Sequence, residues 1–118
     1  MMSLVQKLAA GPLSLATLFL MVGCSSRAEN SADAEQRGAI LFAMHCSPCH
    51  EAVNPQLKVQ PPSLKGLFAS KSLPSGAPAT DDHVKETIIE GRGIMPAFDQ
   101  RLTKDDVNAI VKYLHTLN

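Results

Sequence analysis

The sequence predicts an all-α domain with three main helices and long loops between them. Apolar residues recur at helical spacing in three stretches of the chain. Proline and glycine crowd the segment between the first two of these stretches, and no alternating strand pattern of useful length appears. A chain of 118 residues is long enough for one small domain.

The first 23 residues predict a signal peptide. A single positive charge, on Lys7, precedes an apolar run from Leu8 to Val22. This run of 15 residues is shorter than the roughly 20 that a membrane-spanning helix needs. We therefore expect a secretory signal, which places the domain on the periplasmic side of a bacterial membrane.

The end of this segment, Gly23-Cys24, resembles the lipobox of bacterial lipoproteins, in which the cysteine is lipidated and becomes the first residue. Met21 is a poorer match than the leucine usual three positions before that cysteine. The rival is ordinary cleavage after Ala28, which fits the small-x-small pattern and would give a soluble periplasmic protein. The sequence favours a lipid anchor at Cys24, because lipidation also explains an otherwise unpaired cysteine in an exported protein.

The mature chain is expected to hold a short tether and one domain. Residues 24–32 are small and polar, which suits a flexible tether, and residues 33–118 form the domain. Its first helix is expected to begin at Asp33, which can cap it, with Gln36 in the capping-box position. The apolar stripe expected on this helix consists of Ile40, Leu41 and Met44.

The first helix leads into Cys46-Ser47-Pro48-Cys49-His50, which has the C-x-x-C-H spacing typical of c-type haem attachment. Each thiol can add across one vinyl group of a porphyrin, and the imidazole of His50 is a good iron ligand. A zinc site would need two further ligands at matching spacing, and the third cysteine, Cys24, belongs to the export segment. A thioredoxin-like dithiol would need a βαβ setting that the sequence lacks. The motif predicts one haem c, bound covalently through Cys46 and Cys49.

Two further helices are expected after the haem motif. The segment from Gln56 to Pro78 is rich in proline and glycine and is expected to be loop, with room for one short turn of helix. A second helix is expected to start near Thr80 and to end at Gly91, and a third is expected to be capped by Thr103. The apolar positions of these two helices are Val84, Ile88 and Ile89, and then Val107, Ile110, Val111, Leu114 and Leu117.

Met95 is the candidate for the sixth position on the iron, opposite His50. Glycines at positions 91 and 93 allow the backbone to approach a flat ring closely, and Pro96 fixes the chain direction. A thioether is a soft, neutral ligand that favours ferrous iron. The other histidines and methionine are weaker candidates, since they lie on the proximal side, point away or face solvent: Met44, His45, His83 and His115.

From residue 33 to residue 117 the chain resembles the single-haem class I cytochromes c. In that family a glycine and a phenylalanine of the first helix pack against an aromatic residue and a leucine of the last helix. Gly38 and Phe42 stand at matching distances before the haem motif, and Tyr113 with Leu114 match the other side. The resemblance implies the class I cytochrome c fold, with three main helices and long loops around one covalently bound haem.

The segment from Pro62 to Phe68 also resembles the family segment that follows the haem motif. There a proline carbonyl accepts the Nδ1 proton of the axial histidine, a role that falls to Pro62, with Pro61 as its competitor. Arg92 is either a partner for a haem propionate or simply exposed. The segment from Leu73 to Pro78 has no role in the resemblance and is expected to be a surface loop.

With both axial positions filled, the iron has no open site for a substrate, so we expect electron transfer between redox partner proteins and no enzymatic activity. Removing residues 1–23 takes away Lys7 and no acidic residue, leaving 10 basic and 11 acidic residues, a balance that argues against nucleic acid. We expect a monomer, held at the membrane by the lipid on Cys24. Two alternatives stay open: a haem enzyme or gas-binding protein with a displaceable Met95, and a haem subunit of a periplasmic dehydrogenase or terminal reductase.

Overall fold

The computed structural model describes the chain from residue 25 to residue 118, and its side chains from residue 31 onward. The signal peptide predicted for residues 1–23 and the predicted lipid site at Cys24 lie outside this part. The described elements are α1 (Ser25–His45), α2 (Ser47–His50), the 3₁₀ helix η1 (Leu67–Ala69), α3 (Asp81–Glu90) and α4 (Lys104–Leu114). Apart from two isolated bridges, the described residues form no strand. The prediction of an all-α chain with three main helices is therefore confirmed.

α1 begins earlier than expected, at Ser25 instead of Asp33. Residues 25–35 hold neither glycine nor proline and include alanine, glutamate and arginine, so helix propensity continues through the expected start. The capping role predicted for Asp33 and Gln36 is therefore wrong, whereas the role of residues 24–32 as a tether stays a prediction. In the part of the chain that the structure describes, no helix combines the length and apolar character needed to cross a bilayer.

The buried side of α1 differs from the predicted stripe. Ile40 and Met44 are exposed, with accessible fractions of 56% and 64%, and Leu41 alone of the three predicted residues packs against the core. Gly38 and Phe42 are buried instead, and their spacing of four residues places them on one side of the helix. The stripe is therefore wrong at Ile40 and Met44, because apolar spacing alone does not say which of several neighbouring faces meets a partner.

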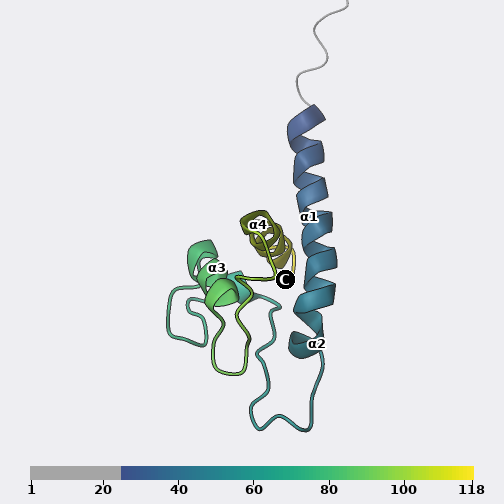
Figure 1. Cartoon of the computed structure of the whole chain (residues 1–118). Coiled ribbons are helices and arrows are strands. Elements are labelled where there is room, and N and C mark those ends of the chain that lie inside the picture. Colours follow the sequence, from purple (N-terminus) through teal and green to yellow (C-terminus); the bar gives the residue numbers. More distant parts are fainter. Residues whose placement is uncertain (1–24) are drawn as a thin grey trace, which may run out of the picture.

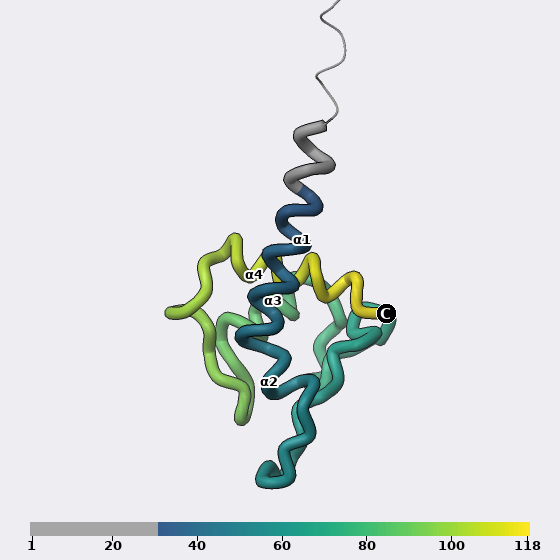
Figure 2. Tube along the Cα trace, turned by 90° about the vertical axis from the view of Figure 1, so that its right-hand side faces the viewer, coloured from purple at the N-terminus to yellow at the C-terminus, as the bar shows by residue number. Residues whose placement is uncertain are grey.

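α4 lies between α1 and α3 and contacts both (Figure 1). The tube in Figure 2 shows the same arrangement from the side, with α1 crossing in front of α4. Thr103 caps α4 as predicted: its hydroxyl accepts from Asp106 N, and the Asp106 carboxylate accepts from Thr103 N, which completes a capping box. Four of the five predicted core positions are buried in this helix: Val107, Ile110, Val111 and Leu114. The fifth, Leu117, lies beyond the end of the helix and is only partly buried.

The crossing of α1 and α4 depends on the absence of a side chain at Gly38. A Cβ there would overlap the backbone carbonyl of Ala109 and would stand 2.9 Å from Cβ of Tyr113. One turn further along α1, the ring of Phe42 packs against Tyr113 with 5.2 Å between the ring centroids. These contacts confirm the helix packing that the resemblance implied.

Replacing Gly38 with alanine is expected to lower the free energy of unfolding by about 1–3 kcal/mol, because the added methyl group must push α1 away from the α4 backbone. The loss should appear even though alanine is the better helix former by about 1 kcal/mol. Denaturant unfolding of the haem-bearing protein measures it. As a control, Ala43→Gly on the exposed side of α1 should cost only the difference in helix propensity. A Gly38→Ala protein as stable as the wild type would contradict the close crossing.

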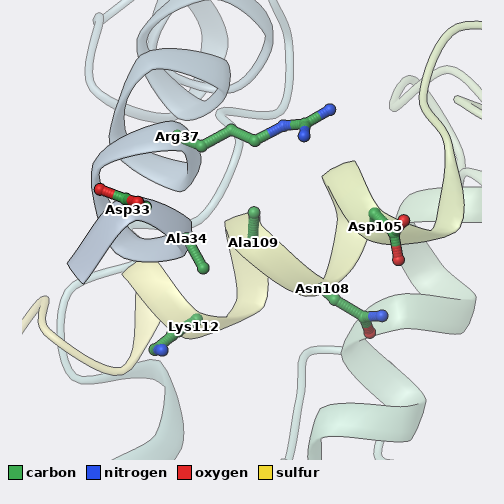
Figure 3. A pocket seen from close by; sticks show the side chains of 7 residues that line it. All are labelled: Asp33, Ala34, Arg37, Asp105, Asn108, Ala109 and Lys112. Atoms are coloured by element: carbon green, nitrogen blue, oxygen red, sulfur yellow. The ribbon is translucent and has the colours of Figure 1, made fainter. Parts of the chain in front are cut away.

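An ion pair joins α1 and α4 beside this crossing. Arg37 places Nη2 2.6 Å and Nε 3.0 Å from Oδ1 of Asp106, while Oδ2 accepts from the backbone and hydroxyl of Thr103. Figure 3 shows Arg37 extending along a groove of about 450 Å³ between the two helices, lined in part by the small side chains of Ala34 and Ala109. Both oxygens of the Asp106 carboxylate are thus occupied.

The hydrogen bonds from Thr103, and then those from Arg37, lower the pKa of Asp106 from 3.8 to about 2 against the opposing effect of burial. Because the folded-state pKa lies below the unfolded value, the carboxylate stabilises the fold above about pH 4, and this contribution is lost as the pH falls toward 2. The expected loss is about 2 kcal/mol. Unfolding of the wild type and of Asp106→Asn at about pH 6 and about pH 2 measures it. If the free energy of unfolding of the wild type exceeds that of Asp106→Asn by the same amount at both pH values, the charge of the carboxylate does not contribute to stability.

α3 is bounded as predicted, since the Thr80 hydroxyl accepts from the first turn and the helix ends at Gly91. Its side chains Val84 and Ile88 are buried. Leu73 joins the same core with an accessible fraction of 7%, because its backbone N–H donates to Ala77 O at 2.8 Å and the segment turns back on itself. The prediction of a mere surface loop is therefore wrong at Leu73.

Candidate functional site

The haem-motif residues Cys46, Cys49 and His50 are carried by a single helical turn. Cys46 forms the turn between α1 and α2, and Pro48 stands at the start of α2, where a backbone donor is not needed. The backbone N–H groups of Cys49 and His50 both donate to Cys46 O, at 3.1 and 2.9 Å. The two cysteines and the histidine therefore share one fixed piece of backbone.

The two thiols of the motif differ in their surroundings. Cys46 packs against the hydrophobic core, whereas Cys49 is exposed, and both are free in the structure. Burial, with a smaller contribution from Cys49, raises the pKa of the Cys46 thiol to about 11. Cys46 is therefore a neutral thiol at neutral pH, and Cys49 is the more accessible of the two.

The imidazole of His50 is oriented by a backbone carbonyl. Its Nδ1 donates to the carbonyl oxygen of Pro62 at 2.8 Å. A carbonyl oxygen can only accept, so Nδ1 carries the proton and Nε2 keeps a free lone pair. The contact is made by Pro62, not by its neighbour Pro61. A hydrogen bond of this kind fixes the ring and strengthens the imidazole as a donor to a metal.

The Pro62 carbonyl is supported by contacts before and after it in the chain. Before it, the Gln60 side chain accepts from Asn54 N at 3.0 Å and donates to Asn54 O at 2.7 Å. After it, Gly66 N donates to Leu117 O at 2.7 Å. The loop that orients His50 is therefore closed on itself at one end and joined to the C-terminal end of the chain at the other.

Met95 ends a very tight turn. Arg92 N donates to Met95 O at 3.0 Å and Met95 N donates to Arg92 O at 2.9 Å, so only Gly93 and Ile94 lie between the paired residues. Gly91 and Gly93 have φ values of 72° and 56°, and a Cβ on Gly91 would come within 2.6 Å of Met95 O. The glycines on both sides of Arg92 therefore permit the turn that fixes the backbone of Met95.

The segments of Cys46 and Met95 pack against the same core, where both side chains are partly buried. The ring of His45, next to Cys46, meets the ring of Phe98 edge-on with 5.9 Å between centroids. Phe98 N in turn donates to Ile88 O at 3.1 Å. The expectation that His45 points away from the iron stays a prediction, and its contact with Phe98 links the end of α1 to the segment after Met95.

Two other histidines make contacts that sequence reasoning missed. His83 Nδ1 lies 2.9 Å from the hydroxyl of Thr80. His115 Nε2 lies 2.7 Å from Oδ1 of Asp81, while the His115 side chain remains exposed, in line with the expectation that it is solvated. The side chain of Arg92 is exposed, and its role toward a propionate stays a prediction.

These residues fit a covalently bound haem of the c type. Two thiols on one helical turn can each form a thioether. The imidazole of His50 presents a single nitrogen, and the thioether of Met95 supplies a second neutral donor. The donor set therefore has the chemistry that a six-coordinate c-type haem needs.

Comparison with known proteins points in the same direction. Residues 33–114 match the family described as cytochrome C oxidase, cbb3-type, subunit III. The cbb3-type cytochrome c oxidase subunit FixP of Azorhizobium caulinodans is 35% identical over 97 residues, which cover 79% of this chain and 30% of FixP. This chain therefore spans less than a third of that relative.

Two smaller relatives are covered more fully. Cytochrome c6 of Picosynechococcus sp. is 31% identical over 81 residues, which cover 65% of this chain and 68% of that protein. Cytochrome c6 of Cladophora glomerata is 32% identical over 78 residues, which cover 66% of this chain and 82% of that protein.

Proposed function

The chain belongs to the cytochrome c family of cbb3-type oxidase subunit III, and on that premise we propose that it carries single electrons with His50 and Met95 as the axial ligands of its iron. It is a class I cytochrome c with one haem c, bound covalently through Cys46 and Cys49, and it takes part in haem-based electron transfer. The observation that supports the ligand assignment most directly is the hydrogen bond from His50 Nδ1 to Pro62 O, which leaves Nε2 for the metal.

When bound, the haem supplies an iron that accepts and releases one electron. The chain keeps the surroundings of that iron constant. Pro62 holds the His50 ring in one orientation, and the backbone pair between Arg92 and Met95 holds the methionine. Because both donors are fixed by backbone contacts, little rearrangement is needed between the two oxidation states. Neighbouring buried side chains such as Phe98 exclude water, which disfavours the more highly charged ferric state.

We place this carrier on the periplasmic side of a bacterial membrane, as a monomer between a donor and an acceptor protein. The apolar run before Gly23 supports export, with residues 1–23 as signal peptide, 24–32 as tether and 33–118 as the haem domain. A lipid on Cys24 would raise the concentration of the domain near membrane-bound partners. Since one relative is a subunit of a cytochrome c oxidase, a terminal oxidase is one class of acceptor that we propose.

A reduced-minus-oxidised spectrum and CO exposure of the reduced protein test the ligand assignment. We expect the spectrum of a low-spin c-type haem, and little change with CO, because Met95 already occupies the sixth position. A rapid and complete spectral change with CO would mean an open site, and would favour the gas-binding or enzymatic alternative.

Mass spectrometry of the mature N-terminus tests the anchor. A diacylated Cys24 supports the tethered carrier. A mature chain that starts at Glu29 would place cleavage after Ala28 and exclude the lipid.

A further inference from the structure

His115 joins three separate parts of the chain near the loop that orients the axial histidine. It is the C-cap residue of α4, directly after Leu114. Its Nε2 lies 2.7 Å from Oδ1 of Asp81, the first residue of α3. Its ring stacks on Phe68 of η1, with 3.7 Å between the ring centroids and 9° between the planes. One side chain thus connects α3, α4 and η1.

The charges at this junction match the two helices that meet there. A cation is favourable at the C-terminal end of a helix and a carboxylate at the N-terminal end, which is where His115 and Asp81 stand. An imidazole that carries a proton at this position would therefore interact favourably with the end of α4 and with Asp81.

Three other charged or titratable groups on these helices have different partners or face solvent. Lys112, one turn before His115, donates to the Ser31 hydroxyl on α1. His83 pairs with Thr80, and Asp82 in the same turn of α3 is exposed. Phe68, the contact from η1, carries no charge. Asp81 is thus the ionic partner that the structure places against His115.

Phe68 belongs to the same short segment as the Pro62 carbonyl. Between them, Gly66 N donates to Leu117 O at 2.7 Å, two residues beyond His115. His50, residues 63–65 and Leu117 also line one hollow of about 350 Å³. The segment that carries the Pro62 carbonyl is therefore joined to the end of the chain that follows α4 by a backbone hydrogen bond.

We propose that Asp81 and His115 form a positioning pair for the axial histidine. The protonated His115 holds Phe68, and with it the segment of Pro62, against the end of α4, so that the Pro62 carbonyl stays on His50 Nδ1. Loss of that proton loosens the segment. This inference rests on the proposed role of His50 as an iron ligand. The test below therefore compares pH values at the two ends of the range from about 5 to about 8, across which histidine side chains in general can change charge.

Hydrogen exchange of the reduced, haem-bearing protein tests the pair. Exchange rates of the Gly66 N–H and the His50 Nδ1–H are measured by NMR from about pH 5 to about pH 8. Each rate is divided by the rate in His115→Gln at the same pH, which cancels the intrinsic pH dependence of exchange. At low pH both protons should exchange about two- to fivefold more slowly in the wild type than in His115→Gln, which is the size of effect expected for an exposed ion pair. At high pH this difference in exchange rate should vanish.

Two further variants separate the pair from its surroundings. For each variant, the exchange rates are again divided by those of His115→Gln at the same pH. This ratio should no longer depend on pH in Asp81→Asn, whereas it should keep its pH dependence in the matched control His83→Gln. A ratio that does not change with pH in the wild type, or a pH dependence that survives Asp81→Asn, overturns the proposal.

The two protons also distinguish this inference from the proposed function. Gly66 reports on the segment whatever binds the iron, whereas the His50 proton shows a haem-ring shift only if His50 is a ligand. Absence of that shift defeats the ligand assignment. The inference fails if the His50 proton shows the haem-ring shift but only the Gly66 N–H has the expected pH dependence of its exchange-rate ratio. In that case the pair of Asp81 and His115 does not affect the axial histidine.

Discussion

Replacing both Cys46 and Cys49 with alanine is expected to leave a chain without haem and with most of its helical structure lost. The domain of residues 33–118 is small for a self-sufficient core, and a haem contributes a large apolar surface that no side chain replaces. Its buried residues include only two aromatic side chains, Phe42 and Phe98. Haem staining, intact mass and far-ultraviolet circular dichroism of protein from a host able to attach haem c measure the effect.

The control for this variant is Cys24→Ala, which removes a cysteine outside the motif. It should retain the porphyrin mass and the helical signal even if it changes membrane attachment. Single variants at Cys46 or Cys49 should be intermediate, because one thioether can still form. A double variant that keeps a covalent porphyrin would contradict the attachment site. A double variant that folds fully without haem would show that the polypeptide core is sufficient for folding.

Met95→Ala is expected to keep the covalent haem but to lose the methionine-to-iron charge-transfer band, and to lower the reduction potential by on the order of 0.1 V or more. The fall follows from the loss of a soft, neutral thioether that favours ferrous iron. The emptied position should also bind CO readily. Absorption spectra of the oxidised protein and a redox titration measure these effects.

Ile94→Ala is the matched control for this second variant. Ile94 lies in the same turn and is exposed, with an accessible fraction of 63%, but it offers no donor atom to iron. Its spectra should match those of the wild type. If Met95→Ala also retains the charge-transfer band and the potential, the sixth ligand lies elsewhere.

Much of the local structure could be predicted because it depends on residues close together in the chain. Thr80 and Thr103 cap α3 and α4 through donors three residues away, and Gly91 ends α3. The haem motif is equally local, since its three functional residues share one helical turn. The start of α1 could not be predicted as well, because no strong stop signal separates Ser25 from Asp33.

The choice between competing residues required the fold. Pro61 and Pro62 look alike in the sequence, and only the path of the loop brings the carbonyl of Pro62 to His50. Ile40 and Met44 look as suitable for the core as Phe42, yet the Gly38 crossing selects the face that carries Phe42.

By itself, the sequence determined the helical class, the attachment motif around Cys46 and Cys49, and the candidate iron donors, because these follow from residue type and short spacing. The tertiary structure alone decided the contacts between distant segments. Arg37 and Asp106 are 69 positions apart and His115 and Asp81 are 34 apart, yet each pair lies within hydrogen-bonding distance. Such pairs form only when helices dock in one register, and no short stretch of sequence encodes that register.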